Sequence, residues 1–235
     1  KLDLYDYLRT NDKTVFINTD DNKQIELIGS YNNTITFGTD AQNECVIKFV
    51  NANPLVSLRY NDTIIHSQLI GDYNYGNIAV AVAIGKHFAV STAHIKEAIE
   101  SYLPDNNRSE IIKKSTTTII LDAYNANPTS MLAALKNLKQ LDLTSTYLFL
   151  GDMFELGNEA EKEHQAISDF VEGNFENNIF LIGENFYKTK TKKTTHKFSS
   201  FEDLKPELKL LQPKNATILI KGSRGMALER LLEFF

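Results

Sequence analysis

Apolar and polar residues alternate over short runs in the first third of the 235-residue chain, and polar turns separate these runs. Runs of this length, rich in Val, Ile, Thr, Tyr and Phe, are typical of β-strands. The pattern predicts strands over residues 14–18, 25–29, 34–38, 45–50, 55–60 and 63–69. The last two flank the turn sequence Asn61-Asp62 and are predicted to form a hairpin. We therefore expect the antiparallel end of a sheet here.

The pattern then becomes helical. Residues 77–88 are rich in Ala, Ile and Val, which predicts a buried helix, and Ser91 begins a second predicted helix. The polar stretch 104–107, Pro-Asp-Asn-Asn, is the clearest linker signal in the chain. We therefore expect two domains, residues 1–106 and 107–235.

In the second domain, predicted strands alternate with predicted helices. The strands are expected over residues 116–124, 147–151, 179–183 and 216–221, and the helices over residues 128–138, 159–175, 201–211 and 226–235. Alternation at this spacing predicts an α/β fold with a doubly wound, mostly parallel, Rossmann-like sheet. Ligands of such folds bind at the carboxyl ends of the strands.

Composition and charge exclude several classes of function. The longest apolar run, residues 78–84, is far shorter than the roughly 20 residues that span a bilayer. A net charge of −5 disfavours nucleic acid as a partner, and the basic run 188–197 is expected to be a solvated loop. Cys45 is the only cysteine, so neither a disulfide framework nor a thiolate metal site is expected, and a cytoplasmic location fits.

The histidines do not suggest a metal centre either. His66, His87, His94 and His196 have no carboxylate or cysteine at ligand spacing. His164 lies on a predicted amphipathic helix, where we expect a surface or packing residue.

Polar residues crowd the end of the first predicted strand of the second domain. The stretch 122–131 reads Asp-Ala-Tyr-Asn-Ala-Asn-Pro-Thr-Ser-Met. Helix capping accounts for Asn127, but it does not account for Asp122, Tyr124 or Asn125 beside a buried strand. These side chains need partners, so they are candidate site residues.

The last predicted strand leads into Lys-Gly-Ser-Arg-Gly-Met at residues 221–226. Backbone amides at the start of a helix attract anions, and Lys221 and Arg224 add positive charge. We therefore expect this segment, with Ser223, to bind a carboxylate.

A third polar loop, Leu-Gly-Asp-Met-Phe-Glu-Leu-Gly, occupies residues 150–157 after another predicted strand. Asp152 and Glu155 are suited to an ammonium group, although exposure to solvent would explain them equally well. The ends of parallel strands share one edge of a sheet, so the three loops are expected to converge on one crevice. Its mixture of charges would suit a zwitterionic ligand.

Five segments resemble the Mur ligase family in sequence and in order. They are 71–77 (Gly-Asp-Tyr-Asn-Tyr-Gly-Asn), 107–110 (Asn-Arg-Ser-Glu), 122–131, 150–157 and 221–226. The stretch 122–131 resembles the branch of the family that adds D-alanyl-D-alanine to UDP-N-acetylmuramoyl-tripeptide. The resemblance is good from about residue 55 onward and weaker before it, where residues 16–21 are the main anchor.

The resemblance implies a part of an ATP-dependent peptidoglycan ligase that works through an acyl phosphate. It implies that Arg108 reaches phosphate and assists catalysis. The nucleotide contacts implied are Asn74, Asn77, Arg108, Asp122 and Tyr124. The contacts implied for the amino substrate are Asn125, Asn127, Asp152, Glu155, Lys221, Ser223 and Arg224, of which Lys221 and Arg224 mainly serve the dipeptide carboxylate.

No G-x-x-x-x-G-K-[ST] phosphate loop occurs in the sequence. The family carries that loop and its Mg²⁺ ligands upstream of the matching segments. Residues 1–106 are therefore expected to be the end of a P-loop-type ATPase domain, and residues 107–235 the amino-substrate domain. We expect a C-terminal fragment that is inactive alone.

Two other interpretations remain open. One is another ligase of the same superfamily, such as folylpolyglutamate synthase, although the segments 122–131 and 221–226 argue against it. The other is a doubly wound module that binds a nucleotide or a dipeptide without turnover.

Overall fold

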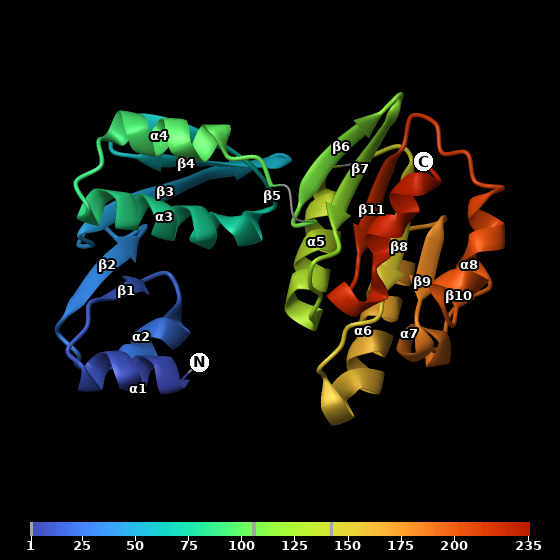
Figure 1. The fold of residues 1–235 in the computed structure, drawn as a ribbon, viewed down its shortest axis with the longest axis horizontal. Helices are drawn as coiled ribbons and strands as arrows, with labels where there is room; N and C mark the ends of the chain where they lie inside the picture. The colour runs from blue at the N-terminus through green and yellow to red at the C-terminus, as the bar shows by residue number, and fades with distance from the viewer. Residues whose placement is uncertain (1, 105–106, 142) are drawn as a thin grey trace. The chain divides into compact units, whose positions relative to one another are not determined.

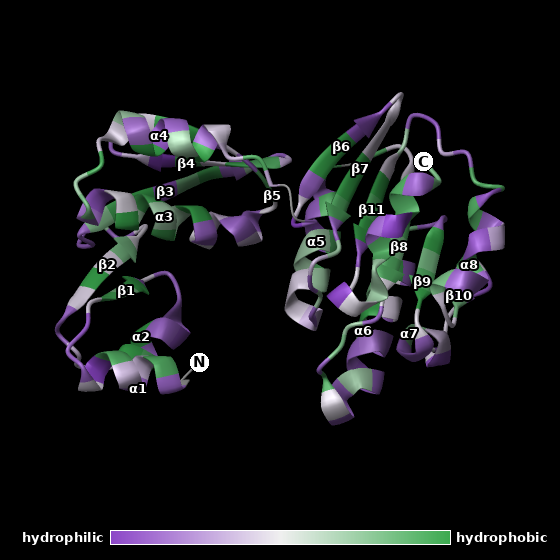
Figure 2. Ribbon diagram, in the orientation of Figure 1, coloured by the Kyte–Doolittle hydropathy of each residue, from purple (hydrophilic) through white to green (hydrophobic). Residues whose placement is uncertain are grey.

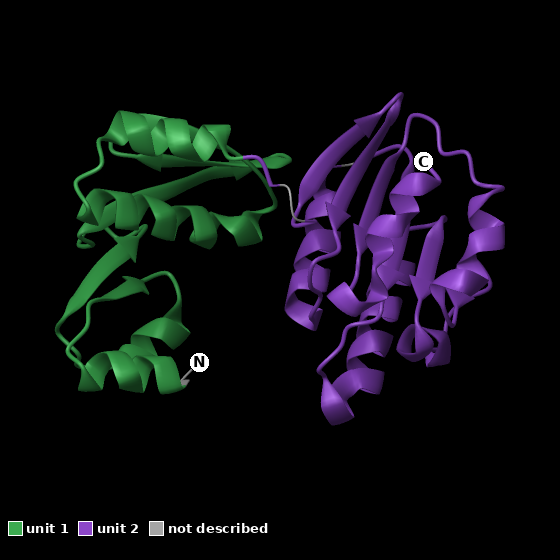
Figure 3. Cartoon of the chain, viewed as in Figure 1, with its two compact units in different colours: residues 1–102 green, residues 103–235 purple. Residues whose placement is uncertain are grey.

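The computed structural model describes residues 2–104, 107–141 and 143–235, which form two compact units, Lys1–Tyr102 and Leu103–Phe235 (Figures 1 and 3). The linker predicted at 104–107 includes residues 105–106, which lie outside the described residues.

Within the described residues, the first unit contains one five-stranded sheet with the order β1-β2-β3-β4-β5. The strands are β1 (Val15–Asn18), β2 (Thr34–Gly38), β3 (Cys45–Ala52), β4 (Leu55–Tyr60) and β5 (Thr63–Ile70). The helices are α1 (Leu2–Thr10), α2 (Asn22–Ile28), α3 (Tyr75–His87), α4 (Thr92–Ser101) and the 3-10 helix η1 (Asp72–Asn74). The predicted hairpin of β4 and β5 and the two helices after it are confirmed.

The expectation of an antiparallel region is correct only for β3, β4 and β5, because β1 pairs with β2, and β2 with β3, in parallel. The strand predicted over residues 25–29 is wrong, since these residues belong to α2 and its C-cap, Gly29. The carboxylate of Asp21 accepts hydrogen bonds from the amides of Lys23 and Gln24 and so begins that helix. A crossover segment is needed between two parallel strands, and α2 supplies it.

A buried apolar cluster joins the sheet of the first unit to α3. Ile47, Val56 and Leu58 are at most 1% exposed and belong to the same cluster as Ile78 and Val82 of α3. Burial of this stripe is what holds α3 on the sheet, since apolar area removed from water contributes roughly 25 cal/mol per Å².

Within the described part of the second unit, a six-stranded sheet has the order β10-β9-β8-β11-β7-β6. The strands are β6 (Glu110–Lys114), β7 (Thr117–Asp122), β8 (Thr146–Gly151), β9 (Ile179–Ile182), β10 (Thr195–Phe198) and β11 (Thr217–Lys221). The helices are α5 (Pro128–Gln140), α6 (Ala160–Asn174), α7 (Glu184–Lys188), α8 (Phe201–Leu208) and the 3-10 helices η2 (Gly157–Glu159), η3 (Arg224–Met226) and η4 (Leu228–Glu233). Only the edge strand β6 is antiparallel, which confirms the predicted mostly parallel sheet.

The four inner strands β9, β8, β11 and β7 are largely buried on both faces, which is why they read as apolar runs (Figure 2). On one face Phe149 and Ile218 pack with α8 and η4. Successive side chains point to opposite faces, so Leu148 and Leu219 face the other layer.

Three short elements differ from the sequence prediction. β6, α7 and β10 were not predicted, and the supposed loop 188–197 contains the end of α7 and the start of β10. The helix predicted over residues 226–235 is instead two 3-10 segments, because Ala227 adopts a left-handed conformation with φ 48° that interrupts an α-helix.

Candidate functional site

Three polar loops lie side by side at one edge of the second sheet. They follow β7, β11 and β8, which are adjacent and parallel. In the register, Lys221 at the end of β11 lies opposite Asp122 of β7 and Leu150 of β8. The three strands therefore end at the same level, as the alternation of strands and helices predicted.

Two glycines let these strand ends approach closely. A Cβ atom on Gly222 would lie 3.1 Å from the Cα atom of Gly151, and one on Gly151 would lie 2.8 Å from Leu228 Cδ1. Any side chain at either position would push the loops apart, so the sequence Lys-Gly-Ser-Arg has a packing reason for its first glycine.

A buried ion pair forms the floor of the site. The Lys221 ammonium, on a residue that is 1% exposed, contacts the Asp122 carboxylate, and it lies 3.5 Å from the Asn125 carbonyl oxygen. The Ser109 amide donates to the other carboxylate oxygen of Asp122 at 3.2 Å. Lys221 was expected to bind a substrate carboxylate, but its side chain is only 2% exposed and its ammonium already contacts the Asp122 carboxylate. We therefore assign it to neutralising Asp122.

Two arginines lie near the exposed Tyr124 ring. The guanidinium carbon of Arg108 lies 3.8 Å from the ring centroid, and that of Arg224 lies 5.7 Å from it. Tyr124 is 38% exposed, and its amide donates to the Asn107 carbonyl at 3.1 Å, which holds the segment before β6 next to the end of β7. Exposed guanidinium groups stacked on one ring are suited to anions, because each planar fork can bind phosphate or carboxylate through two hydrogen bonds.

The start of α5 uses the amide side chain of Asn127. The side-chain Oδ1 of Asn127 accepts from the backbone N–H of Ser130 at 2.9 Å, and the backbone N–H of Asn127 donates to Ser130 Oγ at 3.1 Å. This capping box confirms that Asn127 caps α5, a role that it has whether or not it also contacts a ligand. Asn125 is exposed beside it.

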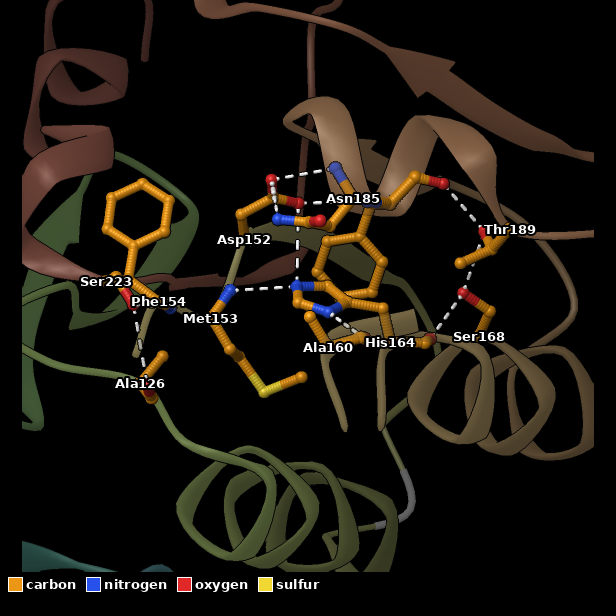
Figure 4. A network of polar contacts seen from close by, with 11 residues as sticks. Ala126, Asp152, Met153, Phe154, Ala160, His164, Ser168, Asn185, Thr189 and Ser223 are labelled. Atoms are coloured by element: carbon orange, nitrogen blue, oxygen red, sulfur yellow. Dashed lines mark hydrogen bonds and ion pairs between the residues drawn. The ribbon is translucent and has the colours of Figure 1, made fainter. Parts of the chain in front are cut away.

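The loop after β8 places its two acidic residues differently. Asp152 is 2% exposed, and its carboxylate accepts hydrogen bonds from the Asn185 and Phe186 amides (Figure 4). Glu155 is exposed, with a left-handed backbone at φ 65°. A ligand ammonium can therefore reach Glu155, whereas the carboxylate of Asp152 is already enclosed by α7.

Ser223 also has internal partners. Its Oγ accepts from the Phe154 amide at 2.8 Å and donates to the Ala126 carbonyl at 3.4 Å. It is 4% exposed, so its side chain joins the three loops to one another and does not present a hydroxyl to solvent.

The remaining candidates, Asn74 and Asn77, belong to the first unit. Asn74 is buried and donates to the Ile70 carbonyl at 2.8 Å, while its Oδ1 accepts from Asn77 Nδ2 at 3.1 Å. Asn77 is exposed. The side-chain amide of Asn77 is therefore exposed, and its orientation is fixed by its hydrogen bond to Asn74.

His164 is a packing residue at this edge whose hydrogen bonds the sequence did not reveal. It was expected at the surface or in packing, and it is fully buried, with both ring nitrogens within hydrogen-bonding distance of backbone groups. No local signal reveals this, because its partner Met153 lies 11 positions away across a loop.

Among residues 2–104, 107–141 and 143–235, no three His, Cys, Asp or Glu side chains are grouped to hold a metal ion. In the same residues, none of the helices combines the length and apolar character needed to cross a bilayer.

Comparison with known proteins assigns the second unit to a family. Residues 107–224 match the family described as Mur ligase, glutamate ligase domain. The chain is 28% identical to the UDP-N-acetylmuramoyl-tripeptide–D-alanyl-D-alanine ligase of Bacillus subtilis, over 85% of this chain and 46% of that protein. It is 35% identical to the enzyme of the same name from Buchnera aphidicola (strain Bp), over 70% of this chain and 36% of that protein. The chain therefore spans less than half the length of these relatives.

Among solved structures, the chain resembles the MurF ligase of Thermotoga maritima in complex with ADP, with a TM-score of 0.76 over 95% of this chain and 53% of that one. The sequence identity is 21%, so this likeness supports the fold.

Proposed function

We propose, from the premise that this chain belongs to the Mur ligase family, that it is part of an ATP-dependent ligase of peptidoglycan synthesis. The complete enzyme would join the amine of D-alanyl-D-alanine to a carboxylate of UDP-N-acetylmuramoyl-tripeptide in the cytoplasm. The observation that carries the proposal is the pair of arginines around Tyr124, at the edge where the three family motifs meet.

The nucleotide side of the site is proposed to consist of Arg108 and Tyr124. Arg108 is exposed and lies against a flat ring, which limits its freedom while its donors remain available to phosphate. The ADP complex of the Thermotoga maritima protein supports a nucleotide as ligand of this fold. In the first unit, Asn77, oriented by Asn74, is proposed to contact adenine.

Asp122 is proposed to serve the nucleotide mainly through its place in the floor of the site. The ion pair of Asp122 and Lys221 has no net charge, and the Ser109 amide and the neighbouring Arg108 are ordered on it. A bare carboxylate there would repel phosphate, so neutralisation by Lys221 makes the site acceptable to an anion.

The amino substrate is proposed to lie on the other side of Tyr124. Arg224 would bind the carboxylate of D-alanyl-D-alanine, and Glu155 with Asn125 would receive its ammonium group. All three are exposed on the loops that meet at this edge. The residues of this chain then act by orientation and by electrostatic stabilisation, since bond formation between two held substrates needs no protein nucleophile.

Among the described residues no three His, Cys, Asp or Glu side chains are grouped as metal ligands, and Mg²⁺ is commonly held by one or two carboxylates together with substrate phosphates. We therefore derive no step through a metal from this chain, and we propose that ATP and its metal are held jointly with segments that the longer relatives contain.

Of the two alternatives, the similarity to curated relatives bears on one and experiment on the other. The two curated relatives compared above both bear the name of the D-alanyl-D-alanine ligase, which supports that substrate over the glutamate chain of a folylpolyglutamate synthase. A binding module without turnover is separated from a ligase only by experiment.

Steady-state kinetics of a full-length ligase containing this chain tests the proposal. Arg224→Ala should raise the KM for D-alanyl-D-alanine roughly 10- to 150-fold, since a charge-assisted hydrogen bond contributes about 1.5–3 kcal/mol. The KM for ATP should change much less. Arg230→Ala is the matched control, because Arg230 is an exposed arginine that packs on Phe201 outside the three loops. An equal rise for both substrates, or a rise for ATP only, would contradict the assignment of Arg224.

A further inference from the structure

We propose that His164, as a neutral imidazole, is a positioning residue: it accepts a hydrogen bond from the Met153 amide and thereby fixes the loop that holds Arg224 in place. The link from this loop to the amino substrate rests on the function proposed above. Figure 4 shows the polar contacts that surround the imidazole and reach Ser223, the residue before Arg224.

The hydrogen bonds of His164 determine its tautomer. The Met153 amide can only donate, so Nε2, at 3.0 Å, must accept. The Ala160 carbonyl can only accept, so Nδ1, at 2.6 Å, must carry the proton. Nε2 also lies 3.6 Å from Asp152 Oδ1, but with its lone pair directed at an amide it forms no ion pair there. A protonated ring would lose the Met153 bond and direct an N–H at another N–H.

The imidazole is held on all sides by buried groups. Its ring meets that of Phe186 edge to face, with centroids 4.7 Å apart. The His164 carbonyl accepts from Ser168 Oγ, which also contacts Thr189 Oγ1 at 3.1 Å. α6 and α7 are thereby tied together around the ring, so the position of Nε2 is fixed independently of the loop that it supports.

Asp152 provides a second set of hydrogen bonds that hold the same loop, residues 152–154. Its Oδ2 accepts from both the amide and the side chain of Asn185, and its Oδ1 accepts from the Phe186 amide at 2.9 Å. Gly183, with φ 122°, allows this close approach, since a Cβ there would lie 2.3 Å from the Asp152 carboxylate carbon. The start of the loop is therefore anchored to α7 at Asp152 and to His164 at Met153.

Residues 152–154 in turn position residues 223–225, which include Arg224. The Ser223 amide donates to the Asp152 carbonyl at 3.1 Å, and the Phe154 amide donates to Ser223 Oγ at 2.8 Å. The Phe154 ring covers Gly225, where a Cβ would lie 2.7 Å from it. Both residues that flank Arg224 are thus fixed by residues 152–154, and only the Arg224 side chain extends toward Tyr124.

A buried amide with no acceptor is strongly unfavourable, so the Met153 N–H would turn toward solvent if Nε2 were removed. That turn would move Phe154, and with it Ser223 and the backbone of Arg224. An apolar residue of similar size would fill the same volume but could not accept the hydrogen bond of the Met153 amide, which is why the position requires an acceptor.

Two matched variants separate hydrogen bonding from packing. His164→Gln places an amide oxygen near the position of Nε2 and keeps an acceptor for Met153. His164→Asn places its amide nitrogen near Nδ1, keeps the bond to Ala160 and loses the acceptor. Both lose the ring and its contact with Phe186, and they differ by one methylene group, so a purely packing role predicts only a small difference between them.

Hydrogen exchange of the 235-residue chain is the first readout, because it does not depend on the proposed function. His164→Asn should speed amide hydrogen exchange roughly tenfold at residues 152–157 and 222–226, whereas the exchange rates of His164→Gln should stay near those of the parent chain. Ser223→Ala should loosen residues 222–226 and leave the Met153 amide protected. Strand β4 of the first unit is the internal control. Equal loosening in the Asn and Gln variants, or unchanged exchange at 222–226 in the Asn variant, would overturn the proposal.

Kinetics of the full-length ligase is the second readout. His164→Asn should raise the KM for D-alanyl-D-alanine roughly fivefold or more over that of His164→Gln, with the KM for ATP little changed. If exchange separates the two variants while this KM does not, the positioning of the loop stands and the assignment of Arg224 to the dipeptide fails. If thermal unfolding shows that the Asn variant is unfolded while the Gln variant is folded, the acceptor role is supported in its strongest form.

Discussion

The ammonium of Lys221 contacts the carboxylate of Asp122, 99 positions earlier in the chain, and both residues are buried at the ends of adjacent strands. Two residues that the sequence presents as separate ligand-binding charges are therefore partners of each other. Removing one leaves the other charged, buried and unpaired, which is more costly than the loss of a surface ion pair.

Asp122→Ala and Lys221→Ala should each destabilise the chain by about 3–5 kcal/mol. Guanidinium unfolding followed by circular dichroism measures this. The double variant Asp122→Asn with Lys221→Met should recover a large part of the loss, because it removes both charges and leaves an amide oxygen for the Ser109 N–H. If Asp122→Ala unfolds like the parent chain, the ion pair is not structural, and a loss of ATP use in that variant can be read as a lost ligand contact.

The chain by itself should neither hydrolyse ATP nor form the amide bond. Its sequence contains no phosphate loop, and its described residues bring together no cluster that could hold a metal ion. Phosphate release by the purified chain, compared with a mock preparation, checks this. Release above the mock level would show that the chain carries an ATPase site of its own.

Arg108→Ala in a full-length ligase should lower the rate at limiting ATP roughly 10- to 150-fold, the effect of losing about 1.5–3 kcal/mol of charge-assisted bonding. The rate of Arg108→Lys at limiting ATP should lie between those of the parent enzyme and Arg108→Ala, because lysine keeps the charge but not the planar guanidinium stacked on Tyr124. Circular dichroism should be unchanged, since Arg108 is exposed. Normal turnover of Arg108→Ala at limiting ATP would remove this residue from the nucleotide side.

Glu100 should make the stability of the first unit depend on pH. Burial by itself raises the pKa of Glu100, but hydrogen bonds from the Lys96 side chain and the His66 amide outweigh it, so the pKa is lowered from its ordinary value of 4.5. A lowered pKa means that the stabilisation is present above pH 4.5 and is lost as the pH falls through the folded-state pKa.

Glu100→Gln should therefore cost about 0.5–1 kcal/mol at neutral pH, a modest value because the side chain is partly exposed, and close to nothing in strong acid. Urea unfolding over a series of pH values measures the difference. Glu97→Gln, at an exposed position of the same helix, is the control. A difference between Glu100→Gln and the parent chain that stays constant down to low pH would contradict the ion-pair explanation.

The sequence by itself determined the doubly wound sheet of the second unit and the polar character of its strand ends. Apolar runs such as that of β11, and caps such as Asn127 before Pro128, act between neighbours in the chain, so they can be read without knowing the fold. The same local reading failed over residues 25–29, where an apolar-polar pattern of five residues fits a strand and a short helix equally well.

Only the tertiary structure decided which of the polar side chains face a ligand. Arg108, Tyr124 and Arg224 remain at the surface, whereas Lys221 and Asp152 are enclosed by Asp122 and by α7. The physical reason is that the burial of a charged side chain at a strand end depends on which strand lies beside the strand that carries it. That order, β8-β11-β7, brings together segments up to 99 positions apart, and no local pattern specifies it.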